Sequence, residues 1–303
     1  MTASVIHVSE EVQEAVRSGR PVVALESTIF THGLPRPRNL DVALAAEASL
    51  REQGVTPATI GVFNGVPTVG LSTEQITILS NTDDIAKVSL RDLPVVSFFG
   101  KHGGTTVAAT AFLAHEAGVK VFSTGGLGGV HHGASETFDE SADMTTLAQV
   151  PIVVISAGVK SILDIGSTLE RFETLNIPVI GYGTTKYPGF YVSDSGFSVQ
   201  YAVHTPEEAA GVINARDALG LPQAVLLANP VAEDKQLPPE QLDDILERAW
   251  AEADAQGIGG NATTPFLLDF IQRDTKGLSL DVNIEVYRGN VALGGLVATA
   301  LTR

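Results

Sequence analysis

Short apolar runs of strand length alternate along this chain with longer segments of helical periodicity, and this alternation constrains the fold more than any other feature. Seven runs are predicted to be strands: residues 21–25, 58–63, 95–99, 119–123, 152–156, 179–182 and 224–228. Strands and helices that alternate in this way form a layered α/β sheet. Ligands of such folds bind where loops leave the carboxyl ends of the strands.

The predicted helices have recognisable start and stop signals. Three segments with helical periodicity end at a glycine: 39–53 before Gly54, 105–117 before Gly118, and 240–256 before Gly257. Capping-box spacing marks three more helix starts, at Ser72 with Gln75, Ser167 with Glu170, and Thr205 with Glu208.

Composition and charge narrow the classes of function. With 303 residues, 44% hydrophobic and 18% charged, the chain can bury one large core or at most two modest ones. No segment has the composition of a linker or a disordered tail, so we expect one domain over residues 1–303. A net charge of -16 repels phosphate backbones and anionic lipid, so neither nucleic acid nor membrane is an expected partner. An anionic small substrate would need a local cluster of hydrogen-bond donors.

Residues 1–11 include two glutamates and no apolar signal core, and no apolar run approaches the ~18 residues of a membrane helix. We therefore expect a cytoplasmic protein. The chain has no cysteine, which excludes disulfides, thiolate metal sites and cysteine nucleophiles.

Glu26 directly follows the predicted strand 21–25, and a loop with histidine, glycine and two prolines follows at residues 31–37. A carboxylate at a strand end is either a charge that faces water or a partly desolvated group. In the second case its pKa is raised, which suits a general acid or base.

Lys160 comes shortly after the predicted strand 152–156, and the segment that contains it is predicted to open a helix. The positive end of a helix dipole disfavours a structural cation in the first turn. That field would lower the pKa of the amine and favour the neutral form that Schiff-base chemistry requires. The alternative is a solvated lysine that points away from the helix axis.

A loop dense in glycine, residues 123–134, leaves the predicted strand 119–123 and contains His131 and His132. It matches neither the P-loop nor the dinucleotide-binding pattern. Closely spaced glycines let backbone N–H groups approach an anion, although a structural turn uses glycine as well. The two histidines are candidate ligands or sugar contacts.

Three carboxylates fall within five positions, at Asp139, Glu140 and Asp143. They repel one another unless they are solvated or share a cation, and such oxygen ligands suit Mg²⁺ or Mn²⁺. In a helix, Asp139 and Asp143 would share one face. A solvated, acidic helix start is the other interpretation.

The segment 100–107 brings glycines and threonines to a predicted helix start, which is a favourable site for an anion. Lys87 is open to two interpretations, a site residue or a plain surface lysine.

Together and in this order, these segments resemble the pseudouridine-5'-phosphate glycosidase family, which includes the indigoidine-cluster proteins. The similar segments are residues 24–28, 87–89, 103–107, 124–131, 137–143, 156–161, 228–230 and 264–268. The resemblance therefore covers nearly the whole chain.

The resemblance implies a three-layer α/β/α fold with a mixed, mostly parallel sheet, assembled as a homotrimer. It implies reversible cleavage of pseudouridine 5'-phosphate to uracil and ribose 5-phosphate. Lys160 would form a Schiff base at C1 of the sugar, Glu26 would transfer protons, and Asp139 would hold one Mn²⁺ ion largely through water. Contacts to the sugar phosphate are implied for Lys87, Thr106, Val107, His131, Ser141, Ala142, Asp143 and Asn283.

The chain departs from the common pattern of this family at His132, where many relatives carry Arg, and at Gly104, where Ala is frequent. The pair Phe98 and Phe99 is also bulkier than usual. These positions bear on the identity of the base, and they keep a second activity open. It is a C-glycosynthase that joins ribose 5-phosphate to an aromatic polyketide.

Two other classes are less well supported by the residues. A silent sugar-phosphate binding or regulatory protein would be favoured by loss of Lys160 or Glu26, and both are present. A Schiff-base aldolase barrel needs eight βα units, whereas about seven strands are predicted, with uneven spacing.

Overall fold

The computed structural model describes residues 5–258 and 263–303, so that residues 1–4 of the amino-terminal segment discussed above lie outside it. The strands are β1 (His7–Val8), β2 (Val22–Leu25), β3 (Thr56–Phe63), β4 (Val66–Val69), β5 (Ala86–Val88), β6 (Gly103–Thr105), β7 (Val121–Ser123), β8 (Val153–Ser156), β9 (Val179–Tyr182), β10 (Tyr201–Val203) and β11 (Val225–Ala228).

The helices are α1 (Glu10–Arg17), α2 (Arg38–Glu52), α3 (Thr73–Asn81), α4 (Leu93–Phe98), α5 (Val107–Glu116), α6 (Ala134–Thr137), α7 (Ala142–Leu147), α8 (Ile165–Thr174), α9 (Pro206–Ala218), α10 (Pro239–Ala255), α11 (Thr263–Asp274) and α12 (Leu278–Ala300). Two short turns complete them, the π-helical η1 (Ile29–Gly33) and the 3-10 helix η2 (Leu90–Asp92).

In the described residues the strands form one 11-stranded sheet with the order β1-β4-β3-β2-β7-β8-β11-β9-β10. Strand β6 pairs with β3 and with β5 beside this path. The pairs that β3 makes with β4 and β6 are antiparallel, and the other pairs in this part of the chain are parallel. The expected mixed, mostly parallel sheet is confirmed.

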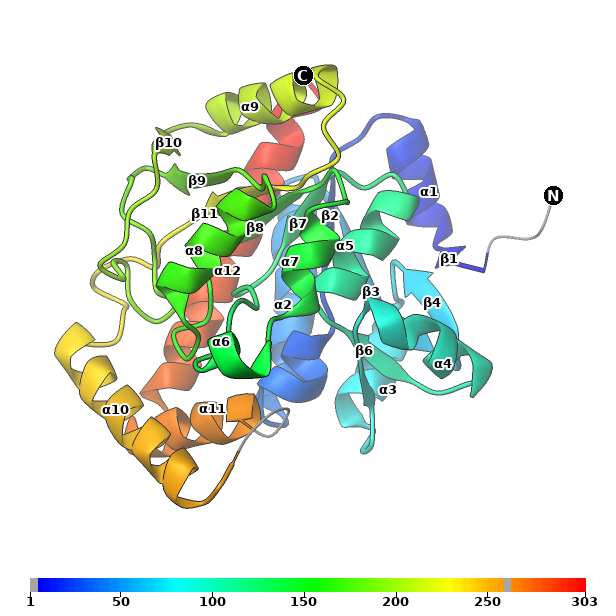
Figure 1. The fold of residues 1–303 in the computed structure, drawn as a ribbon. Helices are drawn as coiled ribbons and strands as arrows, with labels where there is room; N and C mark the ends of the chain where they lie inside the picture. The colour runs from blue at the N-terminus through cyan, green and yellow to red at the C-terminus, as the bar shows by residue number, and fades with distance from the viewer. Residues whose placement is uncertain (1–4, 259–262) are drawn as a thin grey trace.

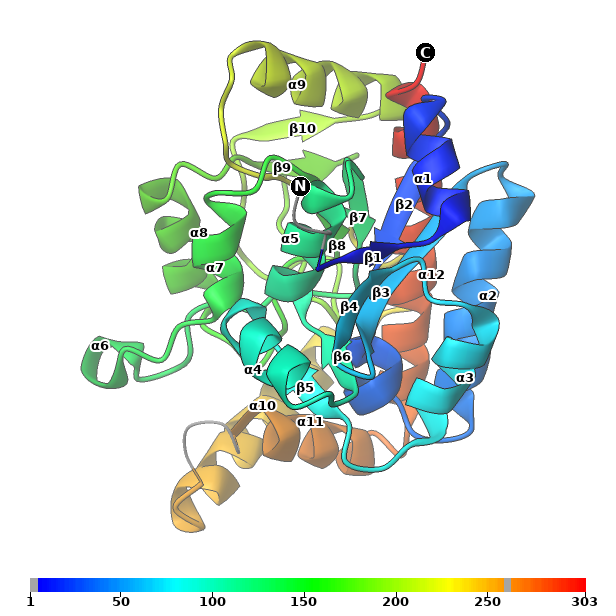
Figure 2. The same ribbon diagram turned by 90° about the vertical axis from the view of Figure 1, so that its right-hand side faces the viewer.

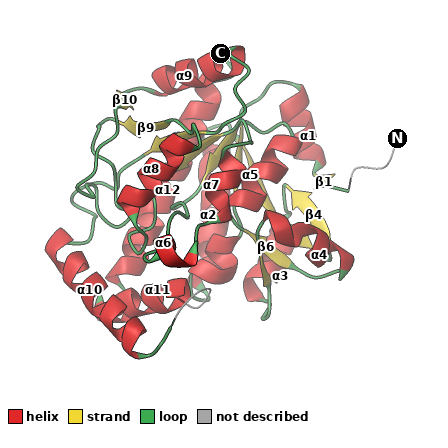
Figure 3. Cartoon of the chain, in the orientation of Figure 1, coloured by secondary structure: helices red, strands yellow, loops and turns green. Residues whose placement is uncertain are grey.

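Helices cover both faces of the sheet, which gives three layers (Figures 1, 2 and 3). Helices α2, α3, α9 and α12 supply one hydrophobic cluster, and α1, α5, α7 and α8 supply the other. Strand β2 serves both: Val22 and Ala24 face one cluster, whereas Val23 and Leu25 face the other. This division follows from the two-residue period of a strand, and it explains why β2 reads as a continuous apolar run.

Six of the seven predicted strands are present, and the predicted strand 95–99 is wrong. That segment lies in α4 and just beyond it, with Pro94 in the first turn, where a fixed φ and a missing N–H suit a helix. The side chains of Phe98 and Phe99 are 83% and 63% exposed, so the apolar run does not mark a buried strand.

The predicted helices 39–53, 105–117 and 240–256 correspond to α2, α5 and α10. The capping box at Ser72 is complete, and the Thr205 side chain accepts from the Glu208 N–H at 3.1 Å. The start predicted at Ser167 is wrong, because α8 is capped by Asp164, whose carboxylate accepts from the Ser167 N–H.

Helix α12 was not predicted from the sequence, although it runs across β2, β7 and β8 on one face of the sheet. Buried residues, among them Val282, Val291 and Val297, recur around much of its circumference. A helix that is buried on most of its sides has only a weak amphipathic period to reveal it. No helix in residues 5–258 or 263–303 combines the length and apolarity that crossing a membrane requires.

Candidate active site

Three neighbouring parallel strands, β2, β7 and β8, end at the same edge of the sheet, and the residues that follow them form the candidate site. Glu26 follows β2, Thr124 follows β7, and Lys160 lies in the loop after β8. Loops at the carboxyl ends of parallel strands build ligand sites in open α/β folds.

Glu26 is buried, with 7% of its surface exposed. The Thr28 hydroxyl donates to one carboxylate oxygen and the Thr124 hydroxyl donates to the other. Burial raises the pKa of Glu26, and the positive charge of Lys160 and the two hydroxyl donors oppose that rise. Of the two interpretations open from the sequence, the structure supports the desolvated carboxyl and excludes a charge that faces water.

Lys160 is half-buried, and its Nζ donates to the carbonyl oxygen of Gly126 at 2.8 Å. Its own backbone N–H donates to the carbonyl oxygen of Leu127 at 3.1 Å. The loop that contains Lys160 is therefore hydrogen-bonded to the glycine-rich loop of residues 123–134, called the glycine loop below. The predicted position in the first turn of a helix is wrong, because α8 begins only at Ile165. The helix-dipole argument therefore does not apply to Lys160.

The structure brings Lys87 and Asp143 to the same place. The protein around Lys87 lowers the pKa of its amine, first through burial and then through the positive charge of Lys160. The charges of Asp143 and Glu26 oppose this fall. Two lysines and two carboxyl groups from four separate segments thus interact electrostatically at one edge of the sheet.

Asp143 lies in the first turn of α7 and is buried. One carboxylate oxygen accepts from the Ala108 N–H at 3.0 Å, and the other accepts from the Gly128 N–H at 2.9 Å. Charge-assisted bonds of this kind are among the stronger hydrogen bonds in proteins. Asp143 therefore joins the start of α5 to the glycine loop.

Ser141 and Ala142 are the cap and the first residue of α7, and the Ser141 hydroxyl accepts from the Asp143 N–H at 3.2 Å. Thr106 and Val107 occupy the same positions at α5. The Thr106 Oγ1 atom is enclosed and has no hydrogen-bond partner within the protein. An unpaired buried hydroxyl costs about 1–3 kcal/mol, so this atom is a donor that a ligand can satisfy.

The two adjacent histidines have different surroundings. The Nδ1 atom of His131 lies 3.9 Å from a carboxylate oxygen of Asp139, and burial lowers the pKa of His131 while Asp139 opposes the fall. His132 instead meets the Trp250 ring edge-on at a centroid distance of 4.9 Å. The positive charges of Lys87 and Lys160 also lower the pKa of His131, which places this histidine near the candidate site.

The three carboxylates near residue 140 do not act as one group. Residues 139–143 are not a single helix, since α6 ends at Thr137 and α7 begins at Ala142. Glu140 pairs with Arg171 at 3.0 Å, while Asp143 binds backbone N–H groups. The Asp139 side chain is 41% exposed, and residues 5–258 and 263–303 contain no cluster of three or more acidic or histidine side chains suited to a metal.

The glycines of the 123–134 loop are required mainly by packing. A Cβ atom at Gly126 would lie 2.5 Å from Phe190, one at Gly128 would lie 2.2 Å from Ser141, and one at Gly129 would lie 2.4 Å from the Thr168 hydroxyl. Gly125 faces the Oδ1 atom of Asn283 on α12, which brings this predicted site residue to the loop.

Sequence reasoning did not identify Thr28, Thr124 or Asn290 as site residues. Asn290 is fully buried in α12, and its amide donates to the carbonyl oxygens of Thr124 and Gly125 at 2.8 and 3.1 Å. Asn229, which follows β11, donates in turn to Asn290 at 2.9 Å. An asparagine among buried apolar residues is the sequence signal that could have identified a buried residue of this kind, which hydrogen-bonds the backbone of the site.

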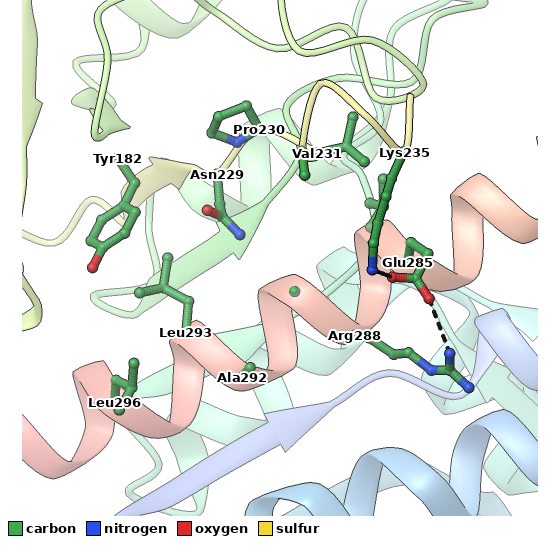
Figure 4. Close-up of a pocket in the computed structure, with 13 residues that line it drawn as sticks. Tyr182, Asn229, Pro230, Val231, Lys235, Glu285, Arg288, Ala292, Leu293 and Leu296 are labelled. Carbon is green, nitrogen blue, oxygen red and sulfur yellow. Dashed lines mark hydrogen bonds and ion pairs between the residues drawn. The ribbon is translucent and has the colours of Figure 1, made fainter. Parts of the chain in front are cut away.

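A cavity of about 420 Å³ lies on the other side of Asn229, between the ends of β9 and β11 and helix α12 (Figure 4). Lys235 and Arg288 both point to Glu285 there, at 2.5 and 3.0 Å. Neither Glu26 nor Lys160 lines this cavity, so it is separate from the candidate site.

Fold and site together define an α/β enzyme with a lysine and a buried carboxylic acid at the carboxyl edge of a mostly parallel sheet. The family model of indigoidine synthase A like proteins matches residues 11–300. The chain belongs to this family, as the sequence resemblance predicted.

Curated relatives support the assignment. A pseudouridine-5'-phosphate glycosidase from Saccharopolyspora erythraea is 60% identical over 301 residues, with 99% of each chain covered. One from Frankia alni is 51% identical, covering 97% of this chain and 82% of the relative.

Two solved structures share the fold. Prealnumycin C-glycosynthase AlnA, in complex with ribulose 5-phosphate, has a TM-score of 0.92 and 33% identity, with 99% of this chain and 97% of that chain covered. An indigoidine synthase A-like protein from Thermotoga maritima has a TM-score of 0.89 and 33% identity, with 100% and 99% covered.

Proposed function

We propose that this chain is a pseudouridine-5'-phosphate glycosidase, which cleaves pseudouridine 5'-phosphate reversibly to uracil and ribose 5-phosphate. The observation that carries the proposal is the meeting of Lys160 with the buried acid Glu26 at one edge of the sheet. Full-length relatives with this activity in their names, up to 60% identical, support it.

The chemistry explains why an amine and an acid are needed together. A carbon–carbon glycosidic bond has no leaving-group oxygen to protonate, so two carboxylates of the ordinary glycosidase kind do not suffice. In the proposed mechanism the Lys160 amine bonds to C1 as the bond from C1 to the ring oxygen breaks; that oxygen keeps the electron pair and takes up a proton, and the nitrogen loses one, which leaves an open-chain amine adduct. As the bond from C1 to the base breaks, its electron pair remains on the base carbon, and the nitrogen lone pair forms a C=N bond.

Glu26 supplies the proton that the base carbon takes up. Burial, which raises its pKa, keeps more of this carboxyl in its acid form near neutral pH than an exposed glutamate would have. The Thr28 and Thr124 hydroxyls fix its orientation. Water then hydrolyses the iminium, which releases ribose 5-phosphate and regenerates the Lys160 amine.

We assign the phosphate to the start of α5. Thr106 offers a hydroxyl without a partner in the protein, and Val107 is the first residue of a ten-residue helix, whose amino end attracts anions. Lys87 adds a positive charge in the same region. Because the chain carries a net charge of -16, this local cluster is needed to bind an anionic substrate.

We further propose one Mn²⁺ or similar hard cation per subunit, at Asp139. One half-exposed carboxylate fits a cation that keeps most of its water shell, and the structure offers no all-protein cage there. When bound, the cation would offset the negative charge of the substrate. His131, 3.9 Å from Asp139, would lie at the edge of this site.

The C-glycosynthase activity is the second candidate, and the structural similarity to AlnA favours it. The identity to that enzyme is 33%, whereas the identity to a named glycosidase reaches 60%. We therefore rank cleavage of pseudouridine 5'-phosphate first.

A homotrimer in the cytoplasm completes the proposal. Val95, Phe98 and Phe99 on and beside α4 are exposed, and apolar groups gathered in this way are typical of contact surfaces. Light scattering tests the assembly, and a monomeric chain would contradict it.

The cytoplasm is the compartment we propose. A charged sugar phosphate does not cross a membrane freely and is retained inside the cell, which supports this location.

The activity is tested by incubating the purified chain with uracil and ribose 5-phosphate and, separately, with pseudouridine 5'-phosphate. We expect both reactions to reach the same equilibrium mixture. Coupling of ribose 5-phosphate to an aromatic polyketide, with no reaction of uracil, would favour the second candidate instead.

A further inference from the structure

Lys87 lies on a short edge strand, which has few hydrogen bonds to the rest of the sheet. Its strand β5 has three residues and, among the described strands, pairs with β6 alone. A short edge strand with one neighbour has few ladder hydrogen bonds to fix its position. Contacts from outside the sheet therefore matter for the placement of Lys87.

His32 in η1 provides such a contact. Its Nε2 atom lies 3.0 Å from the carbonyl oxygen of Ile85, the residue before β5. A carbonyl oxygen can only accept, so Nε2 carries a hydrogen and donates it. Burial lowers the pKa of His32, the bond to Ile85 opposes this, and the charge of Lys87 lowers it further, which agrees with a neutral ring close to Lys87.

Thr31 connects this ring to the segment that carries Glu26. Its Oγ1 atom lies 2.7 Å from the Nδ1 atom of His32 and 2.9 Å from the carbonyl oxygen of Ser27, the residue after Glu26. Both of these atoms are acceptors when the ring is neutral with its hydrogen on Nε2, so the single hydroxyl hydrogen of Thr31 is shared between them. The Ser27 hydroxyl accepts from the Thr105 N–H at 2.8 Å, one residue before Thr106.

The same pair of residues also rests on β6. A Cβ atom at Gly104 would lie 2.1 Å from the Thr31 Oγ1 atom and 3.4 Å from the His32 Nδ1 atom. Any larger residue at Gly104 would displace Thr31. The Thr31 and His32 side chains thus connect the three segments that carry Glu26, Lys87 and Thr106.

We infer that His32 is a positioning residue, which acts with Thr31 to hold β5, and through it Lys87, in register with the Glu26 segment. The inference rests on the proposed function in one respect, because it takes Lys87 to be a contact of the substrate phosphate. His32 itself need not touch the substrate.

Steady-state kinetics with pseudouridine 5'-phosphate test this role. His32→Leu removes the donor to Ile85, and we expect KM to rise about 3- to 10-fold, the effect of one hydrogen bond, with kcat within about twofold. His32→Gln keeps a donor at the position of Nε2 and should restore KM. In a Lys87→Met background, His32→Leu should add no further loss, since both changes act through Lys87.

Arg51→Gln is the matched control. This variant removes an exposed ion pair between α1 and α2, in which Arg51 binds Glu11 at 3.0 Å. The pair lies away from the candidate site. The KM of Arg51→Gln should equal that of the wild type. Additive losses in His32→Leu with Lys87→Met, or a His32→Gln variant as impaired as His32→Leu, would overturn the inference.

Amide hydrogen exchange gives a readout that does not depend on activity. In His32→Leu we expect faster exchange at Ala86 and Thr106, whose N–H groups donate to His102 and Val88 and so join β5 to its neighbours. Unchanged exchange at both amides would overturn the inference. An inactive wild-type chain would refute the proposed function alone, because faster exchange in the variant would still support the positioning role.

Discussion

Glu26 is a buried acid whose ionisation opposes folding. Because burial raises its pKa above the ordinary value of 4.5, the folded chain binds this proton more tightly than the unfolded chain does. The resulting stabilisation is full below pH 4.5 and is lost as the pH rises through the folded pKa. Glu26→Gln cannot ionise. The melting temperature of this variant minus that of the wild type should therefore increase as the pH rises above 4.5.

Thermal unfolding at several pH values measures this difference. Glu47→Gln is a matched control, since burial also raises the pKa of Glu47, which lies on α2 and accepts from the Thr59 hydroxyl at 2.6 Å. It should show the same trend with pH while turnover is retained. A difference for Glu26→Gln that does not change with pH would mean that Glu26 is not desolvated.

Turnover measurements test the proposed catalytic role of Glu26 separately from its effect on stability. Proton transfer by a positioned side chain contributes roughly 10²–10⁴-fold in rate, and we expect Glu26→Gln to lose about that factor. Lys160 should still form its imine with free ribose 5-phosphate. Retained turnover would assign the proton to another group, with Asp143 as the first candidate. Loss of imine trapping would assign Glu26 to opening or holding the sugar.

The glycine loop depends on one narrow contact with the start of α7. A methyl group at Gly128 would lie 2.2 Å from the Ser141 hydroxyl and 2.7 Å from the Asp143 carboxylate. Gly128→Ala should therefore break the bond that joins this loop to Asp143, lower stability by about 1–3 kcal/mol and reduce kcat/KM at least tenfold.

Gly54→Ala controls for strain in this prediction. Gly54 has φ +75 with no atom within 4 Å of an added Cβ, and it lies just before β3, at the end of that strand opposite the site. It should lose about 1–2 kcal/mol of stability and keep full activity. Equal losses of activity in both glycine variants would show that the effect is one of stability alone.

Elements with a strong local pattern could be predicted, whereas elements defined by packing could not. Strand β2 and the acid after it were visible because a run buried on both faces ends abruptly at Glu26. The loop of Lys160 was not, since its course depends on tertiary hydrogen bonds, among them those of Lys160 to Gly126 and Leu127. Strand β5 was missed for a similar reason, because it is short and is defined by its pairing with β6.

The site residues divide in the same way. The sequence resemblance named Lys160, Glu26 and Lys87, and the structure shows that their charges interact. It gave no indication of Asn290, whose contacts to Thr124 and Gly125 come from a helix more than 160 residues away in sequence. The supports of a site depend on tertiary packing, which a local pattern does not contain.

The proposed requirement for a metal is tested on the whole protein. We expect turnover to stop after exhaustive chelation and to return with Mn²⁺, because in the proposed function an anionic substrate binds near Asp139 in a chain of net charge -16. Elemental analysis of the purified protein should find about one ion per subunit, and less in Asp139→Asn. Full activity with no metal detected would refute this requirement.

The covalent step is tested by borohydride reduction in the presence of ribose 5-phosphate, followed by peptide mass spectrometry. The account predicts one sugar-phosphate adduct, on Lys160, which disappears in Lys160→Ala and persists in Lys87→Met. Lys87 is the informative rival, since burial lowers the pKa of its amine in the same site. An adduct that persists at the wild-type level in Lys160→Ala and is lost in Lys87→Met would contradict the account.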